Sequence, residues 1–189
     1  MIKLNINAQK LAYIAKFASK EPSRFYLQGV YFTPSLEIVA TDGHRMGVLK
    51  NAFTVEAGEL KEGQLLFIQR GELSQIKKIK GFVSVIIEDS GAVTIKQENS
   101  VEYIPTYLID GTFPPQWEKI KDDAVAGTKE SGTWTTRAIA FNPAYMESFA
   151  YNSKDWTRVE LGPTECAPVI IKSYRLGDDF TGVLMPIRW

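Results

Sequence analysis

Residues 36–49 read LEIVATDGHRMGVL, two largely apolar segments separated by an Asp-Gly dipeptide. Apolar residues on both sides of an Asp-Gly dipeptide are typical of two antiparallel strands joined by a tight turn. We therefore predict strands at 36–41 and 45–49, with Asp42 and Gly43 in the turn between them.

The polar residues of this turn allow two interpretations. Asp42 and His44 would fit an acid/base pair that serves Cys166, the only cysteine, as a nucleophile. Alternatively, they are the polar residues of an ordinary hairpin turn. A Cys/His hydrolase also needs an orienting group and an oxyanion site, and the sequence around Cys166 is typical of a loop between strands. We therefore expect no enzymatic activity.

More strands and three helices are predicted around the hairpin. The helices have Asn7 as N-cap and an end near Ser19, a range of 71–79, and Asn142 as N-cap with Pro143 at the first position. Because the helix starts recur at similar intervals, a unit of one helix and several antiparallel strands occurs three times, which predicts an α+β fold. The further strands, separated by Gly, Asp and Asn, are predicted at 24–32, 82–88, 92–97, 100–108, 157–161, 168–174 and 181–186.

The composition excludes several classes of protein. Twenty-two basic and twenty-two acidic side chains give a net charge of zero, so the chain is no polycation that coats nucleic acid. One cysteine and one histidine form neither an internal disulfide nor a zinc site, and no glycine-rich phosphate loop is present, so we expect no metal and no cofactor. The N-terminus lacks the apolar core of a signal peptide, and no stretch reaches the length of a membrane span, so we expect a cytoplasmic protein.

Positive charge is concentrated in two regions with a helical pattern. On the first helix, lysines share a face with Tyr13 and Phe17, opposite Leu11 and Ile14. Such stripes would contact the phosphates of DNA without reading its sequence, although an ordinary solvated helix face accounts for them equally well. The two clusters are Lys10, Lys16 and Lys20 on the first helix, and Lys77, Lys78 and Lys80 near the end of the second.

Five tracts, in order along the chain, resemble the bacterial DNA polymerase III beta sliding clamp. Residues 1–121 resemble the complete middle domain of that clamp and 134–189 the second half of its last domain, with 122–133 (DDAVAGTKESGT) as a small, polar linker. Nothing resembles the first domain or the first half of the last. So truncated a version suggests a phage or another mobile element. The five tracts are RFYLQGVYF (24–32), LEIVATDGHRMGVL (36–49), YLIDGTFPPQWEKI (107–120), AFNPAYM (140–146) and GVLMPIRW (182–189).

The resemblance implies a ring that encircles duplex DNA. Twelve helix-and-sheet halves close the family's clamps, with helices lining the hole and a continuous sheet outside. Three halves per chain would require four chains. The odd number predicts a dihedral tetramer, in which the third unit pairs with its own copy across a two-fold axis. The lysines would then face DNA, and the protein would be a processivity factor for a DNA polymerase.

The resemblance also implies a binding pocket for short peptides of polymerases and other replication proteins, between the middle and last domains. Met185 and Pro186 would fit a terminal strand packed on a core as well as this pocket. Met46, Ile187 and Trp189 depart from the family's pattern. A clamp-derived decoy or regulator that does not encircle DNA is the alternative function. The matched pocket positions are Leu27, Thr41, Gly43, His44, Arg45 and Met46 on one wall, and Val183, Leu184, Met185, Pro186 and Arg188 on the other.

Overall fold

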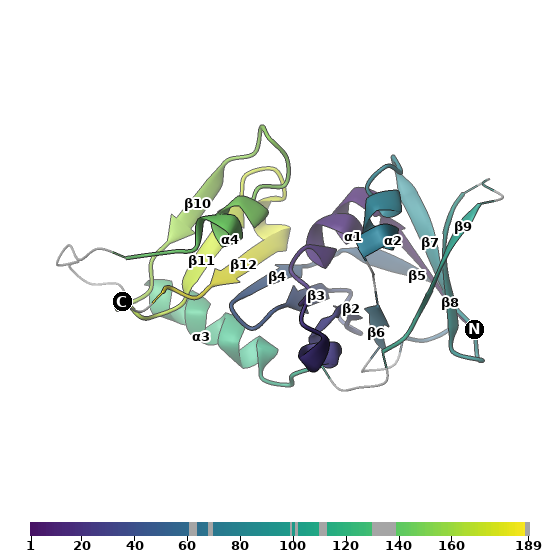
Figure 1. Cartoon of the computed structure of the whole chain (residues 1–189), viewed down its shortest axis with the longest axis horizontal. Helices are drawn as coiled ribbons and strands as arrows, with labels where there is room; N and C mark the ends of the chain where they lie inside the picture. Colours follow the sequence, from purple (N-terminus) through teal and green to yellow (C-terminus); the bar gives the residue numbers. More distant parts are fainter. Residues whose placement is uncertain are drawn as a thin grey trace. The chain divides into compact units, whose positions relative to one another are not determined.

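The computed structural model describes residues 1–60, 64–67, 70–98, 100, 102–109, 113–129 and 139–187. The chain divides into two units (Figure 1). Unit 1 holds residues 1–42 and 48–113, and unit 2 holds residues 43–47 and 114–189. We expected the first domain to end at residue 121 and to include the 43–47 segment, so both boundaries differ from the prediction.

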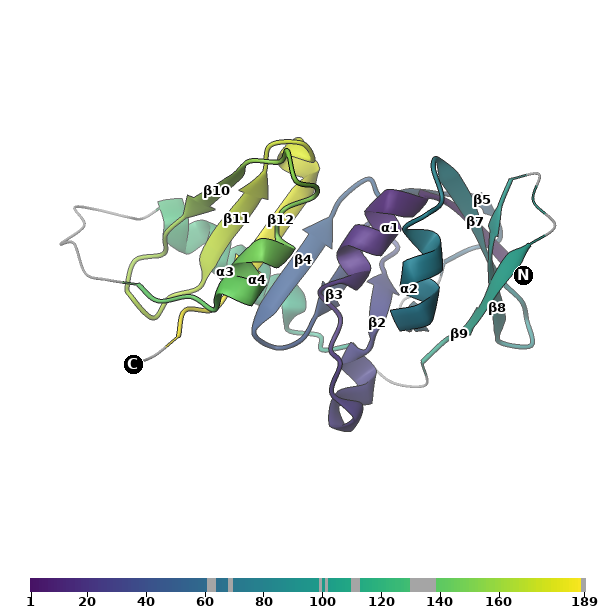
Figure 2. The same ribbon diagram turned by 45° about the horizontal axis from the view of Figure 1, so that its top comes forward.

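Within its described residues, unit 1 contains the α-helices α1 and α2, a short 3₁₀ helix and strands of two antiparallel sheets. One sheet has the strand order β5-β1-β7-β8-β9, and the other contains β3, β2 and β6, with β4 next to β3. Helices α1 and α2 lie side by side (Figure 2). The elements are β1 (Ile2–Asn7), α1 (Ala8–Ala15), the 3₁₀ helix η1 (Pro22–Leu27), β2 (Gly29–Phe32), β3 (Ile38–Thr41), β4 (Arg45–Leu49), β5 (Phe53–Ala57), β6 (Gln64–Phe67), α2 (Arg70–Ile76), β7 (Phe82–Ile87), β8 (Ala92–Gln97) and β9 (Tyr103–Tyr107).

The two halves of unit 1 exchange their first strands. Strand β1 precedes α1 but pairs with β7, which follows α2. Strand β6 precedes α2 but pairs with β2, which follows the η1 segment after α1. Each half therefore completes the sheet of the other.

Helix α1 begins as the sequence predicts. The Asn7 side chain caps it by accepting hydrogen bonds from the backbone N–H of Gln9 and Lys10, at 3.0 and 3.1 Å. Tyr13 and Phe17 were predicted on an exposed face, but both are buried and their rings meet edge to face at 5.6 Å. The prediction was wrong because α1 is covered on nearly all sides, so aromatic residues on its second face belong to the core.

Unit 2 contains one sheet with the order β10-β11-β12, followed by the part of β4 that belongs to this unit. Helices α3 and α4 cover opposite faces of this sheet (Figure 2). Phe149, at the end of α4, is fully buried against Gly182, where an added Cβ would lie 2.5 Å from the phenyl ring. The elements are α3 (Trp117–Lys129), α4 (Pro143–Ser148), β10 (Thr157–Glu160), β11 (Val169–Ser173), the 3₁₀ helix η2 (Gly177–Asp179) and β12 (Phe180–Leu184).

Two sequence predictions need correction. Residues 24–27 were predicted as strand but lie in η1, which starts at Pro22, a residue that suits the first position of a helix. Residues 122–129 of the predicted linker belong to α3, and 130–133 lie outside the described residues. Trp117 and Ala124, seven residues apart, bury one side of α3, so the small and polar composition concealed an amphipathic helix.

Within the described ranges, no helix is long and apolar enough to cross a membrane.

Candidate functional site

Five of the six predicted DNA-facing lysines follow the C-terminal ends of α1 and α2. Only Lys10 is inside a helix as described, because α1 ends at Ala15 and α2 at Ile76. The chain continues past each end with tighter i→i+3 hydrogen bonds, such as Phe17 to Ile14 and Ile79 to Ile76. The expected stripes are therefore clusters at helix C-termini, where cations also interact favourably with the helix dipole. Lys16, Lys77 and Lys78 lie in these turns, and Lys20 and Lys80 follow them.

The side chains in these clusters differ in exposure. Lys16 is half-buried, and its ammonium lies 4.9 Å from the centre of the Tyr13 ring, a cation–π contact. Lys20, Lys77 and Lys78 are exposed. Unit 1 thus presents solvated cations after both of its helices.

The Asp-Gly turn of the hairpin forms as predicted. Gly43 has a φ of 89°, a conformation that glycine adopts without strain. On the side of the turn that belongs to unit 1, Arg24 donates a hydrogen bond from Nη1 to the carbonyl of Asp42 at 3.0 Å and pairs with Glu21 at 3.1 Å. The two sides of the turn thus make contacts in different units.

His44 and Arg45 pack on α4 in unit 2. The His44 ring stacks on the Tyr145 ring, with centroids 5.9 Å apart and planes 16° apart. The guanidinium carbon of Arg45 lies 5.0 Å from the centre of the same ring. Both side chains thus have a packing role, whereas Cys166 is exposed in the loop between β10 and β11.

The C-terminal segment extends β12 along this cluster. The backbone N–H of Met185 donates to the carbonyl of His44 at 3.0 Å, and that of Ile187 donates to the carbonyl of Ala140 at 2.8 Å. Met185 and Ile187 remain exposed by 40% and 48%, although both are apolar. Unit 2 therefore has an apolar surface bordered by an imidazole, a guanidinium and a tyrosine ring, which we call the Tyr145 wall: His44, Arg45, Tyr145, Met185 and Ile187.

Comparison with known proteins finds likeness in structure alone. No protein-family model matches, and no curated protein matches. The DnaN sliding clamp of Bartonella birtlesii, solved bound to griselimycin, superposes over 100% of this chain and 66% of its own, with a TM-score of 0.68 and 20% identity. DNA polymerase III subunit beta of Borrelia burgdorferi, in complex with a natural product, matches over 100% of this chain and 64% of its own, with a TM-score of 0.68 and 16% identity.

The chain has the fold of a bacterial DNA sliding clamp. A third match is the beta sliding clamp of C. crescentus, with polyethylene glycol bound to a putative beta-motif tethering region, at 16% identity and a TM-score of 0.64 over 99% of this chain. The α+β class and the clamp resemblance predicted from sequence are thus confirmed. The chain spans less than two thirds of the length of the first two clamps, at 66% and 64%.

The residues of the predicted peptide pocket come from both units. Gly43, His44, Met185 and Pro186 reach the surface of unit 2, and Arg45 is half-buried there. Leu27, which is buried, and Thr41 belong to unit 1, and Arg188 lies outside the described residues.

Three further pocket predictions need correction, because the side chains are at most 4% exposed: Met46, Val183 and Leu184. Strand β12 is an inner strand with helices over both faces of its sheet, so side chains on both faces are buried. Val183 and Leu184 lie on this strand, and Met46 lies on β4, the strand next to it.

The clamp fold also contains a hollow that sequence reasoning missed. It lies within unit 1 between the end of α2 and strands β8 and β9, with a volume of about 800 Å³. Lys78, Lys80 and Glu102 contribute charges to it, and Ile95 and Ile104 contribute apolar surface. The signal was the alternation of β9, which turns Ile104 inward and exposes Tyr103.

Proposed function

We propose that this protein is a DNA sliding clamp, a processivity factor without enzymatic activity. Four copies would form a ring around duplex DNA, and a surface of each copy would bind short peptides of replication proteins. The observation that carries the proposal is the match to solved sliding clamps over 99–100% of the chain. Four copies follow from twelve halves per ring and three per chain.

The lysines after α1 and α2 support DNA binding. They are placed at corresponding ends of two equivalent helices, so the two halves of unit 1 would present charge to the same kind of surface. Contacts of this type neutralise phosphates and release counterions, and they carry no base information. Weak, salt-sensitive binding to any duplex is the expected behaviour of a clamp that slides.

Particle mass and charge reversal test the ring. Native mass spectrometry should give four chains, and electron microscopy should reveal an opening as wide as duplex DNA. The triple variant K10E/K16E/K20E should lose retention on nicked circular DNA and stimulation of polymerase. K50E/K96E/K119E, with the same change in net charge at exposed positions elsewhere, is the matched control. A monomer, or equal loss in both triple variants, would contradict the proposal.

The Tyr145 wall supports peptide binding. Exposed methionine adapts to different apolar partners, while the ring and cations beside it can orient polar groups. Griselimycin, bound by the B. birtlesii clamp, is a suitable first probe because its binding needs no knowledge of the natural partner. M185E and Y145A should weaken its binding at least tenfold in calorimetry. I120E, at an exposed apolar position of α3, should not.

A decoy that binds replication peptides without encircling DNA is the second candidate, favoured by the short span of the chain relative to solved clamps. It predicts that griselimycin binding persists, that no ring forms and that the lysine variants change nothing. The mass measurement separates the two functions.

A further inference from the structure

Strand β10 forms the outer edge of the unit 2 sheet, among the residues that the structure describes. It pairs with β11 on one side, with Thr157 opposite Ser173 and Glu160 opposite Ile170. An edge strand presents backbone N–H and C=O groups that a strand of another chain can bind. In unit 1 the corresponding strands, β2 and β7, have neighbours on both sides.

The ladder shows which backbone groups of β10 face outward. The N–H of Tyr174, directly after β11, donates to the carbonyl of Trp156, directly before β10, at 2.9 Å. Backbone groups that face a given neighbour alternate along an antiparallel strand. The backbone groups of Trp156 face β11, so those of Arg158 and Glu160 do so as well. The N–H and C=O groups of Thr157 and Val159 therefore point to the open edge.

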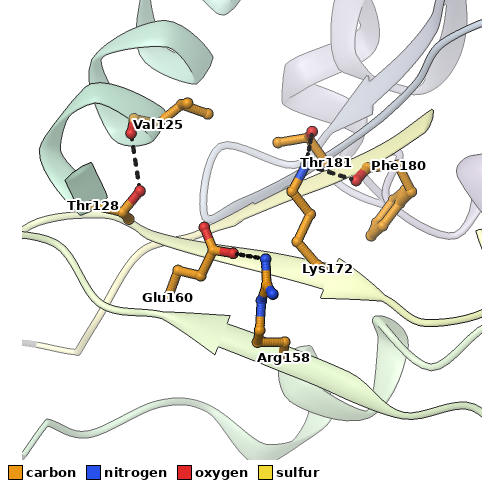
Figure 3. Close-up of polar contacts among 7 residues, drawn as sticks. All are labelled: Val125, Thr128, Arg158, Glu160, Lys172, Phe180 and Thr181. Atoms are coloured by element: carbon orange, nitrogen blue, oxygen red, sulfur yellow. Dashed lines mark hydrogen bonds and ion pairs between the residues drawn. The ribbon is translucent and has the colours of Figure 1, made fainter. Parts of the chain in front are cut away.

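The charges of β10 are arranged for pairing with a copy of itself. Arg158 and Glu160 lie on the same side of the strand and form an ion pair (Figure 3). Arg158 still exposes 74% of its side chain, and its neighbour across the ladder is another cation, Lys172. A cation and an anion two residues apart on one face match the same pair in an antiparallel copy.

We propose that β10 pairs antiparallel with β10 of a second copy, with the two-fold axis at Val159. The outward backbone groups of the two Val159 residues then meet as a hydrogen-bonded pair. Arg158 lies opposite Glu160 of the second copy, and the symmetry repeats this ion pair. These positions are non-hydrogen-bonded, where side chains approach each other most closely.

An exposed aromatic pair borders this edge. Trp156 and Tyr174 are 78% and 83% exposed and adjacent across the ladder. Asp155 fixes this end of the sheet by accepting hydrogen bonds from Ser173 Oγ at 2.7 Å and from the N–H of Arg175 at 3.1 Å. Exposed aromatic side chains that lie next to each other suit a protein contact, and the second copy's strand would continue past Trp156.

This contact identifies how copies of the chain meet, and it therefore rests on the self-association in the proposed function. It buries the edge of β10 and adds two reciprocal ion pairs. Its chemistry requires neither DNA nor peptide, so both tests below use the full chain alone.

Charge exchange tests the register. R158E would place like charges opposite each other at both reciprocal positions, and E160R would do the same with cations. Each should weaken self-association about tenfold in sedimentation experiments. R158E/E160R should restore it, since opposite charges then face each other again. Unchanged association in the single variants, or a double variant as weak as either, would overturn the proposal.

Cross-linking tests the axis. In a C166S background, which removes the exposed native thiol, V159C should form a disulfide-linked dimer, because a hydrogen-bonded pair places its Cα atoms about 5.5 Å apart. T157C, on the same side of the strand, is the control: its two copies would lie about 13 Å apart and stay unlinked. Linking of T157C alone, or of both equally, would overturn the register.

The outcomes separate the two proposals. If the protein is a tetramer but V159C does not cross-link, the β10 contact is wrong and the clamp proposal stands. If V159C cross-links but the protein does not retain DNA, the clamp proposal is wrong and the β10 contact stands. A monomer at working concentration defeats both.

Discussion

The two units are built from the same helix-and-strand half, which is paired with a second half in unit 1 and stands alone in the described part of unit 2. In unit 1, α1 and α2 lie side by side, and the strands that follow them, β2 and β7, each receive a strand from the other half. In unit 2, among the described residues, α4 has no helix beside it on its face of the sheet, and β10 is an edge. In unit 1, β2 and β7 thus have a neighbour on both sides, whereas β10, the corresponding strand of unit 2, leaves one side that a second copy could complete.

The unfolding of the two units can be followed separately because they differ in their tryptophan content. All four tryptophans, at positions 117, 134, 156 and 189, fall in the range of unit 2. Tryptophan fluorescence therefore follows unit 2, and far-ultraviolet circular dichroism follows both units.

The largest effect is expected from F149D. Phe149 is fully buried, so the change creates a cavity and buries an unpaired charge, costing more than about 4 kcal/mol of unfolding free energy. Fluorescence should report an unfolded unit 2 and loss of assembly, while circular dichroism retains the signal of unit 1. M146E, at a half-buried position, should do the same more mildly. Loss of both units together would show that unit 1 depends on unit 2.

A smaller effect is expected from G182A. Its Cβ would lie 2.5 and 2.7 Å from two atoms of the Phe149 ring, and overpacking of this kind costs about 1–3 kcal/mol. The urea midpoint by fluorescence should fall. Adding F149L makes room for the methyl group, so the double variant should be more stable than the sum of the single changes predicts. Strict additivity would refute the contact.

Asp155 should make the stability of unit 2 depend on pH in the acid range. Burial alone would raise the pKa of this carboxyl, but hydrogen bonds from Ser173 and from backbone groups of Tyr151 and Arg175 outweigh it and lower the pKa. The carboxylate therefore stabilises the fold fully above pH about 4, the ordinary value for Asp, and this contribution is lost as the pH falls further.

D155N should accordingly cost about 1–2 kcal/mol near neutral pH. The difference from the parent protein should shrink as the pH is lowered from 5 towards 3, when urea unfolding is followed by fluorescence. D123N, at an exposed position of α3, is the control. A difference that grows in acid would contradict the lowered pKa.

The helix caps should give the smallest effects. N7A removes a cap that accepts two hydrogen bonds and N142A one that accepts a single bond, each costing about 1 kcal/mol. N7A should lower the midpoint measured by circular dichroism and N142A that measured by fluorescence. The reverse assignment would contradict the division into units.

The sequence specified features that depend on local chemistry. The Asp-Gly turn and the caps at Asn7 and Asn142 could be predicted because each depends on a few neighbouring residues. Strand β1 was missed, since polar residues on its outer face and charges near it hid the buried Leu4 and Ile6.

Burial of the site residues could not be predicted in the same way. Val183 and Leu184 are apolar in either a pocket or an inner strand, and the helices over both faces of β12 decide between the two. Likewise, the lysines after α1 fit a helical pattern, and only the end at Ala15 places them outside the helix. Tyr145 was missed because its importance depends on His44 and Arg45, about 100 positions earlier in the sequence.

The exchange of first strands also sets an order of events during synthesis. Residues 2–7 are translated before both strands that they pair with, β5 (Phe53–Ala57) and β7 (Phe82–Ile87), so β1 lacks its second neighbour until most of unit 1 has been translated. Contacts so distant along the chain close slowly, because the loop entropy is lost before the pairing compensates for it. A nascent chain stalled before β7 should therefore be protease-sensitive at its N-terminus, and one stalled well beyond β9 should be resistant there.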